Sequence, residues 1–307
     1  MVRRFATISL FAYLAIAAVA QNTPPNRKEV DNTGWTSSMN FDGSANSQER
    51  VLDLDSSVGY NFDKHWGVDM GVPFSFVSSS SPSTTTTTGP TAGKTTSTSS
   101  SLNSLGNVHM GVNFKANSDL ANYTSTLTAA APTGSTTKGV STGRPNFAWN
   151  NHLEHSFDRL TPFLEAGFSN GLTDTRFHHR PFTTLGFVSQ FTGGSTIDLG
   201  RNFCVGASLY DVLPSGSQKM FSKLVAKKST SVAGTGKHGR SYELAAETTG
   251  DASLTRDNGG SAWVEFTPGQ IFDFQIGYTH SVHLALDTVT FNLGINLGRL
   301  VKKANSY

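Results

Sequence analysis

The sequence predicts a transmembrane antiparallel up-and-down β-barrel of about 12 strands with long extracellular loops. Three observations lead to this fold class: an N-terminal export signal, apolar and polar residues that alternate with a period of two, and short connections that alternate with long ones. Hydrophobic residues make up only 36% of the 307 residues and charged residues only 15%. A barrel with an apolar outer face and a polar lumen suits this composition, because alternate residues serve the two faces.

The N-terminus has the parts of a secretory signal peptide. Arg3 and Arg4 supply the positive start, an apolar run follows, and Ala18-Val19-Ala20 matches the small-x-small pattern that precedes cleavage. The apolar run is too short for an easy transmembrane span, and no later stretch approaches the ~20 apolar residues of a spanning helix. The expected organisation is a signal peptide over 1–20, a periplasmic lead over 21–33, the barrel over 34–300 and a C-terminal tail over 301–307.

Export without a spanning helix leaves a closed barrel as the way to cross a membrane. We therefore expect the protein in the cell outer membrane of a Gram-negative bacterium, in contact with lipid, lipopolysaccharide and the outer-membrane assembly machinery. Arg3 and Arg4 account for the formal net charge of +2. The mature chain is then formally neutral, and its charge gives no reason to expect nucleic acid as a partner.

The alternation of apolar and polar residues is clearest over 65–77. Every second residue from Trp66 to Phe76 is apolar, and Asp69 and Ser75 fall between them. Side chains of a strand point alternately to its two faces, so this pattern predicts a strand with one apolar face. The same pattern predicts strands near 34–42, 50–62, 65–77, 102–115, 119–130, 145–157, 160–170, 183–199, 203–213, 261–267, 271–282 and 287–300.

The connections between these strands differ in length. Short ones are predicted at Asp63-Lys64, Ala116-Asn117-Ser118, Asp158-Arg159, Gly200-Arg201-Asn202 and Pro268-Gly269-Gln270. Longer ones cover roughly 78–101, 131–144, 171–182 and 214–260. Outer-membrane barrels have short periplasmic turns and longer extracellular loops, and with both termini in the periplasm every short turn falls on the periplasmic side. A soluble β-sandwich, the alternative, has no reason to segregate loop length in this way.

Two of the long connections have distinctive compositions. The Ser/Thr-rich stretch over 78–101 has low complexity, so we expect a mobile surface loop; a linker between two domains is the alternative. The stretch over 214–260 is basic in its first half, where the candidates for a constricting loop are Lys219, Lys223, Lys227 and Lys228. A short helix is expected there from the spacing of Met220, Phe221, Leu224 and Val225. The lysines could meet lumen acids, bind lipopolysaccharide phosphates or stay solvated, and residues 241–248 could form a loop hairpin.

The face that would line the lumen collects carboxylates and few basic residues. The candidate pore residues are Asp53, Asp55, Asp69, Glu154, Glu165, Glu265 and Asp273. A ring of carboxylates in a channel favours cations and repels anions. In a barrel of this size the same acids can instead hydrogen-bond to neighbours that fill the interior. The sequence leaves both roles open.

No catalytic, metal-binding or cofactor-binding set emerges from the sequence. Cys204 is the one cysteine, so no internal disulfide forms, and we expect it to be buried in the lumen. His178 and His179 lack the carboxylate or cysteine partners of a metal site. His155 is expected to face lipid instead of pairing with a serine. We therefore expect neither an enzyme nor a cofactor.

Three stretches resemble a known family. They are YNFDKHWGVDMGVPFSF, SLNSLGNVHMGVNFKA and IFDFQIGYTHSVHLALDTVTFNLGINLG. In layout they are similar to the outer-membrane proteins described as transporters of the meta-pathway of phenol degradation. The resemblance implies a channel for small, aromatic molecules and carries over no substrate residue. In the second stretch Gly106-Asn107 stands where that family more typically has Asp, and VKKANSY follows the last strand where many outer-membrane proteins end on an aromatic residue.

Two functions are compatible with these observations. The first is a channel or transporter that lets small solutes, aromatic or cationic, diffuse passively through a polar, acidic lumen. The alternative is a structural or adhesive surface barrel with a closed lumen, which the long Ser/Thr-rich and Lys-rich loops favour. The sequence does not decide between them.

Overall fold

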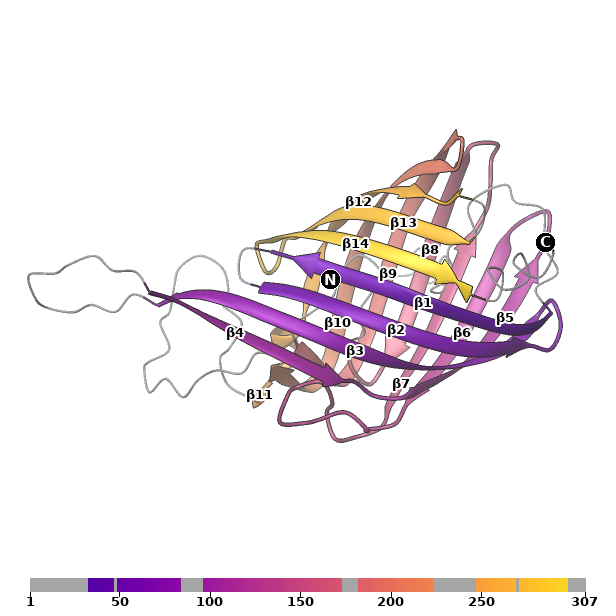
Figure 1. The fold of residues 1–307 in the computed structure, drawn as a ribbon. Helices are drawn as coiled ribbons and strands as arrows, with labels where there is room; N and C mark the ends of the chain where they lie inside the picture. The colour runs from indigo at the N-terminus through magenta and orange to yellow at the C-terminus, as the bar shows by residue number, and fades with distance from the viewer. Residues whose placement is uncertain are drawn as a thin grey trace, which may run out of the picture.

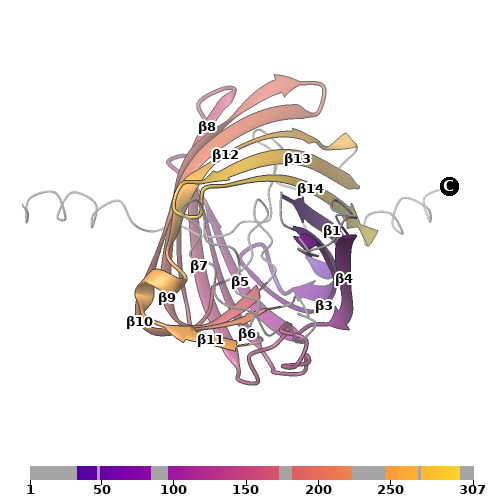
Figure 2. The ribbon, with the colours of Figure 1, turned by 90° about the vertical axis from the view of Figure 1, so that its left-hand side faces the viewer.

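The computed structural model describes residues 33–46, 49–83, 96–172, 182–222, 247–268 and 271–297. These residues form a closed antiparallel β-barrel (Figures 1 and 2). Twelve strands make up the ring, in the order β1-β2-β3-β5-β6-β7-β8-β9-β10-β12-β13-β14, and β14 returns to pair with β1. Within the described part of the chain, no helix has the length and apolar character that crossing a membrane requires.

The strands lie close to where the alternation predicts them. The ring strands are β1 (Gly34–Ala45), β2 (Glu49–Asn61), β3 (Trp66–Ser83), β5 (His109–Asn117), β6 (Asn122–Ala130), β7 (Asn146–Glu154), β8 (Leu160–Ser169), β9 (Phe182–Gly200), β10 (Phe203–Ser222), β12 (Asp257–Phe266), β13 (Phe272–Ser281) and β14 (Leu286–Asn296). Two further strands, β4 (Thr96–Leu105) and β11 (Glu247–Gly250), extend the wall, and a 3-10 helix, η1 (Ala252–Leu254), precedes β12. Each predicted strand overlaps one ring strand, so the predicted fold class is confirmed.

Tight connections gather at one end of the barrel, which we call the turn end. Between β7 and β8, Phe157 and Leu160 exchange both backbone hydrogen bonds across the predicted turn. Asp158 within it adopts a φ of 55°. The turn predicted at Ala116-Asn117-Ser118 lies a little later, at 118–121, where the Ser118 N–H donates to the carbonyl of Ala121. The opposite end, the loop end, holds the longer connections, although 46–48 and 282–285 are also short there.

Asp63 shapes the turn between β2 and β3. Its Oδ1 accepts the backbone N–H groups of Trp66 and His65, each at 2.7 Å. These two donors hold the pKa of the exposed Asp63 carboxyl below its usual range. The predicted turn at Asp63-Lys64 is therefore fixed by a side chain that satisfies the backbone groups of the next strand.

The two faces of the wall have opposite character. In β13 and β14 the side chains alternate strictly between exposed and buried, with Phe274, Ile276 and Val289 outside and Thr279 and Thr290 inside. Apolar side chains on the outer face of a small soluble domain would be costly, whereas lipid accepts them. The polar residues inside pair with one another, as Ser261 and Thr279 do at 2.8 Å between their hydroxyl oxygens.

Aromatic side chains form a belt on the outer face near the turn end. Their rings contact one another within and between strands, with centroids 5.4 Å apart for Trp35–Tyr60, 4.8 Å for Trp66–Phe114 and 4.4 Å for Phe203–Phe266. Transmembrane barrels carry such aromatic girdles at the level of the membrane interface. The belt therefore marks the height at which the turn end of this barrel would leave the hydrocarbon.

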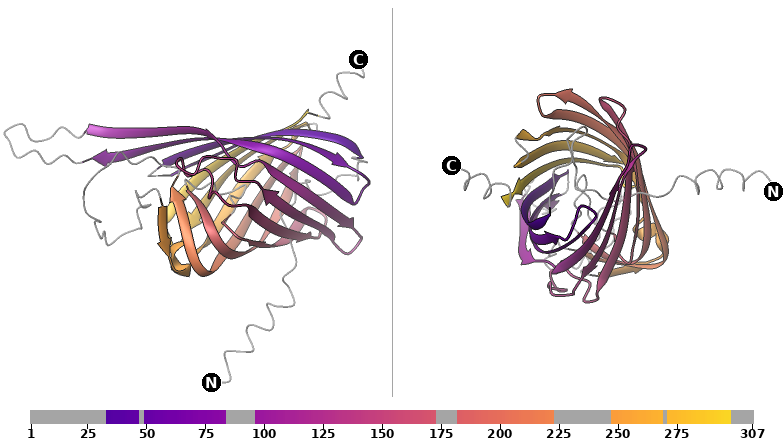
Figure 3. Two further views of the ribbon diagram at one scale, coloured as in Figure 1. Left: turned by 90° about the horizontal axis from the view of Figure 1, so that it is seen from below. Right: turned by 90° about the vertical axis from the view of Figure 1, so that its right-hand side faces the viewer.

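The predicted mobile loop over 78–101 is partly wrong. β3 pairs with β5 only over Trp66–Gly71, and over Phe74–Ser83 it pairs with β4 instead. The resulting β3–β4 hairpin projects beyond the rest of the barrel at the loop end (Figures 1 and 3). Backbone pairing needs no particular side chains, so serine and threonine, which tolerate the extended conformation, can continue the strands past the apolar pattern.

The helix expected around Met220 and Phe221 is also wrong, because β10 continues through both residues to Ser222. β11 pairs with this extension, from Phe221 opposite Glu247 to Gln218 opposite Gly250. The pairing supplies the backbone hydrogen bonds that a helix would otherwise make. Several residues of the sequence analysis lie outside the described residues. They are Lys223, Lys227 and Lys228, the pair His178-His179, and the termini 1–32 and 298–307.

Candidate functional site: the lumen and its mouth

The lumenal face of β1–β3 gathers aspartates. The predicted pore residues Asp53 and Asp55 on β2 and Asp69 on β3 share this face, and Asp42 on β1 lies directly opposite Asp53 in the strand register. We call Asp42, Asp53, Asp55 and Asp69 the aspartate cluster. Each of these strands contributes acids to the same face because residues two apart point the same way.

Two neutral amides and a histidine contact three members of the aspartate cluster. The Asn292 side-chain amide donates to Asp42, and the Asn113 amide donates to Asp69. The imidazole of His109 lies 3.7 Å from Asp55, with both side chains partly exposed. Carboxylates gathered on one face of a lumen create a negative field there, which attracts cations.

A second acidic site lies across the lumenal faces of β7 and β8. His152 is 5% exposed, and its Nδ1 and Nε2 lie 3.2 Å from carboxylate oxygens of Glu165 and Glu154 respectively. Carboxylates only accept hydrogen bonds, so an imidazole that serves both must carry a proton on each nitrogen. These two predicted pore residues are therefore brought together, but they are neutralised in part by a cation between them.

Aromatic rings fill the interior beside this site. The Phe163 ring stacks on His152 with centroids 5.6 Å apart and contacts Trp263 with centroids 6.2 Å apart. Trp263 lies over Gly206, where a Cβ atom would come within 2.3 Å of its ring. Glycine at this position lets a large ring lie flat on the wall, so this side of the interior is packed instead of open.

The remaining predicted residues have different surroundings. Glu265 is 3% exposed and accepts a hydrogen bond from the hydroxyl of Thr267 at 3.1 Å, so its role is one of interior packing. Asp273 faces inward on β13, opposite Gly294 of β14. Cys204 is buried, as expected. The His155 ring lies against Phe157, with centroids 4.3 Å apart.

The connection between β6 and β7 crosses the loop end of the barrel, and we call residues 131–145 the mouth segment. It begins on the β4–β5 side, where the Ala131 N–H donates to the carbonyl of Val108 at 2.8 Å. Val140 then packs with Val51 and Val77, which face inward from β2 and β3. The neighbouring carbonyl of Gly139 accepts from the hydroxyl of Thr183 on β9, at 2.9 Å. Four ring strands separate β3 from β9, so the mouth segment spans from one side of the mouth to the other.

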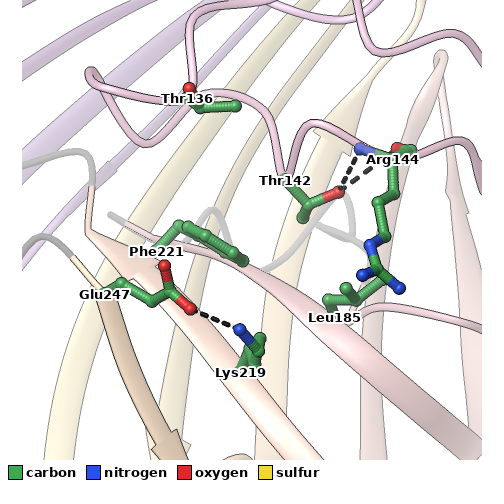
Figure 4. Close-up of a pocket in the computed structure, with 7 residues that line it drawn as sticks. All are labelled: Thr136, Thr142, Arg144, Leu185, Lys219, Phe221 and Glu247. Carbon is green, nitrogen blue, oxygen red and sulfur yellow. Dashed lines mark hydrogen bonds and ion pairs between the residues drawn. The ribbon is translucent and has the colours of Figure 1, made fainter.

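A cavity of about 280 Å³ opens between the mouth segment and the extended strands (Figure 4). Its lining residues are Thr136, Thr142 and Arg144 of the mouth segment, Leu185 of β9, Lys219 and Phe221 of β10 and Glu247 of β11. The Lys219 ammonium lies 2.5 Å from a carboxylate oxygen of Glu247. The predicted constricting residue Lys219 therefore lies at the mouth and is paired to an acid of the neighbouring strand.

Sequence reasoning missed three features of the site. Asp42 follows the same alternation as the other aspartates and could have been found by extending the pattern to β1. Arg144 and the mouth segment carry no periodic signal, because their position depends on contacts with strands distant in the sequence.

Among the described residues, no group of three or more His, Cys, Asp and Glu side chains is placed to hold a metal ion.

Comparison with known proteins bears on the fold. No protein-family model matches the sequence, and no curated protein matches it. An outer membrane channel from Pseudomonas putida F1 has a similar structure, with a TM-score of 0.52 at 9% identity, over 90% of this chain and 100% of that one. This similarity shows that the two chains share a β-barrel fold. The NanC porin has a lower TM-score of 0.44, at 9% identity over 85% of this chain and 98% of its own. The Pseudomonas putida toluene transporter TodX has a TM-score of 0.41, at 11% identity over 86% of this chain and 88% of its own.

Proposed function

We propose that the protein is an outer-membrane channel through which small solutes diffuse passively along a polar, acidic lumen. The observation that carries this proposal is a closed ring of strands whose outer face is apolar and aromatic and whose inner face bears the aspartate cluster. A barrel of this kind suits lipid outside and water inside. The fold shared with the channel of Pseudomonas putida F1 supports the proposal. The proposal also includes export by the segment 1–20 and a location in the outer membrane. It further includes contacts with lipopolysaccharide and the outer-membrane assembly machinery.

The proposed solutes are small cations or small aromatic molecules. The aspartate cluster favours cations, because it places four carboxylates on one face of the lumen. The preference for aromatic molecules rests on the layout shared with the phenol-degradation transporters, and membership of that family is part of the proposal. In this proposal the protein has no catalytic role.

Planar lipid bilayers test the channel directly. The full-length protein should conduct, and a salt gradient should give a reversal potential of the sign expected for cation preference. The triple variant Asp53→Asn, Asp55→Asn and Asp69→Asn should lose most of that preference, since it removes the charges and keeps the side-chain shapes. Asp287→Asn, an exposed acid at the outer rim of β14, is the matched control and should leave it unchanged. A barrel that stays silent in every salt would remove the proposal.

One observation favours the alternative of a surface-binding barrel. The β3–β4 hairpin projects past the ring at the loop end, where it reaches beyond the mouth (Figure 3). Deleting residues 80–100 should then abolish binding of whole cells to a surface while leaving solute uptake intact. Loss of uptake with unchanged binding would count against this alternative and in favour of the channel.

A further inference from the structure

The cavity beneath the mouth segment differs in charge from the aspartate cluster. Lys219 is compensated by Glu247 at 2.5 Å. The Arg144 guanidinium extends into the cavity toward Leu185 (Figure 4), and no acid of the described chain forms an ion pair with it. The cavity therefore holds one positive charge that a ligand could neutralise.

The other walls of the cavity are suited to an apolar body. Phe221, only 8% exposed, and Leu185 present apolar surface, and Thr136 and Thr142 add hydroxyl groups. The volume of about 280 Å³ lies just below the roughly 300–1,000 Å³ of sites for drug-sized molecules. A molecule with a single ring matches this size and this mixture of surfaces.

The backbone that carries Arg144, an exposed residue, is held by the mouth segment. The Thr142 hydroxyl accepts the backbone N–H of Arg144 at 3.3 Å and donates to its carbonyl at 3.2 Å. The mouth segment itself is anchored by Val140 and by the Gly139 carbonyl on opposite sides of the mouth. From this fixed backbone the Arg144 guanidinium can bind a carboxylate with two parallel hydrogen bonds.

We propose that this cavity binds a small aromatic carboxylate at the loop end of the barrel, with the carboxylate on Arg144 and the ring against Phe221 and Leu185. The site is assigned to binding at the mouth and not to permeation, because the aspartate cluster of the proposed channel disfavours anions in the lumen. As a binding site, it does not depend on conduction.

Calorimetric titration of benzoate into the full-length protein in detergent tests the site. Benzoate should bind, and benzamide, which has the same ring without the charge, should bind far more weakly. Arg144→Gln should weaken benzoate binding by about tenfold or more, because it removes both charge-assisted hydrogen bonds. Glu247→Gln should strengthen it by about two- to fivefold, because Lys219 is then free to attract the anion. Arg159→Gln, an exposed arginine in a tight turn at the turn end, is the matched control and should change nothing.

Several results would overturn the site. These are equal binding of benzoate and benzamide, inorganic phosphate binding as tightly as benzoate, or an Arg144→Gln variant that keeps its affinity. Heat-dependent migration on detergent gels checks that each variant forms the barrel, and Arg144→Lys, which keeps the charge but not the paired hydrogen bonds, should show intermediate affinity. Benzoate binding by a barrel that never conducts would remove the channel and keep the site, and conduction without benzoate binding would do the reverse.

Discussion

The aspartate cluster and the mouth cavity belong to one barrel and carry opposite charge. The cluster lies on β1–β3, where the alternation of side chains places its four aspartates on the inner face. The cavity lies at the loop end, where a connecting segment and the extensions of β9 and β10 meet. Strand periodicity therefore sets the charge of the wall, whereas contacts between distant segments set the charge of the mouth. A solute would meet a positive site first and a negative wall afterwards.

The largest expected effect comes from making the opposite wall as acidic as the aspartate cluster. His152→Ala leaves Glu154 and Glu165 without the cation between them, and removing one partner of a buried ion pair costs about 3–5 kcal/mol. The variant should unfold at lower urea concentration, and any barrel that forms should prefer cations more strongly in bilayers. His280→Ala is the matched control, since His280 pairs with Asp287 on the exposed outer rim. Equal effects of the two substitutions would show that the His152 site contributes no more than a surface pair.

A smaller effect is expected from releasing the mouth segment. Val140 is 5% exposed against Val51 and Val77, and burial of a valine side chain contributes about 1.5–3 kcal/mol. Val140→Asp places a charge in this contact, so the segment should leave the mouth, raise single-channel conductance and weaken benzoate binding. Thr137→Asp puts the same charge at an exposed position of the same segment and should do neither. Unchanged conductance in Val140→Asp would mean that the segment does not narrow the mouth.

The fold could be predicted from the sequence because it depends on a short-range pattern. Alternation located the ring strands, and the tight turn at Asp158-Arg159 lies where it was expected. Alternation also assigned Asp53, Asp55 and Asp69 to one face. The alternation pattern failed in segments where the side chains do not distinguish strand from loop or helix. The serine pairs of the β3–β4 hairpin have no apolar face, and Met220 and Phe221 have a spacing that fits helix and strand alike over so short a stretch.

The remaining parts of the site could not be predicted, because they depend on distances between strands. Glu154 and Glu165 were predicted as pore residues, and alternation puts His152 on the same face as Glu154. The β7–β8 pairing, which local periodicity does not give, brings Glu165 to the other side of the His152 ring. Similarly, Glu265 looks like its neighbours in the pattern, yet it is buried with Thr267. Whether an inward acid meets water, a cation or a neighbour depends on the side chains of the next strands in the ring, and local periodicity does not carry that information.

The hydrogen bond from Asn292 to Asp42 joins residues separated by 250 positions in the sequence. It belongs to the β1–β14 seam, which can form only after the last strand has been synthesised. Closing a loop of that length costs about 5 kcal/mol of chain entropy, and the backbone pairs of the seam offset this cost together. Barrel formation is therefore expected to be slow and governed by long-range contacts. The four aspartates lie on β1–β3 and can gather on one face before the seam closes, but Asp42 meets the Asn292 amide only once the seam has formed.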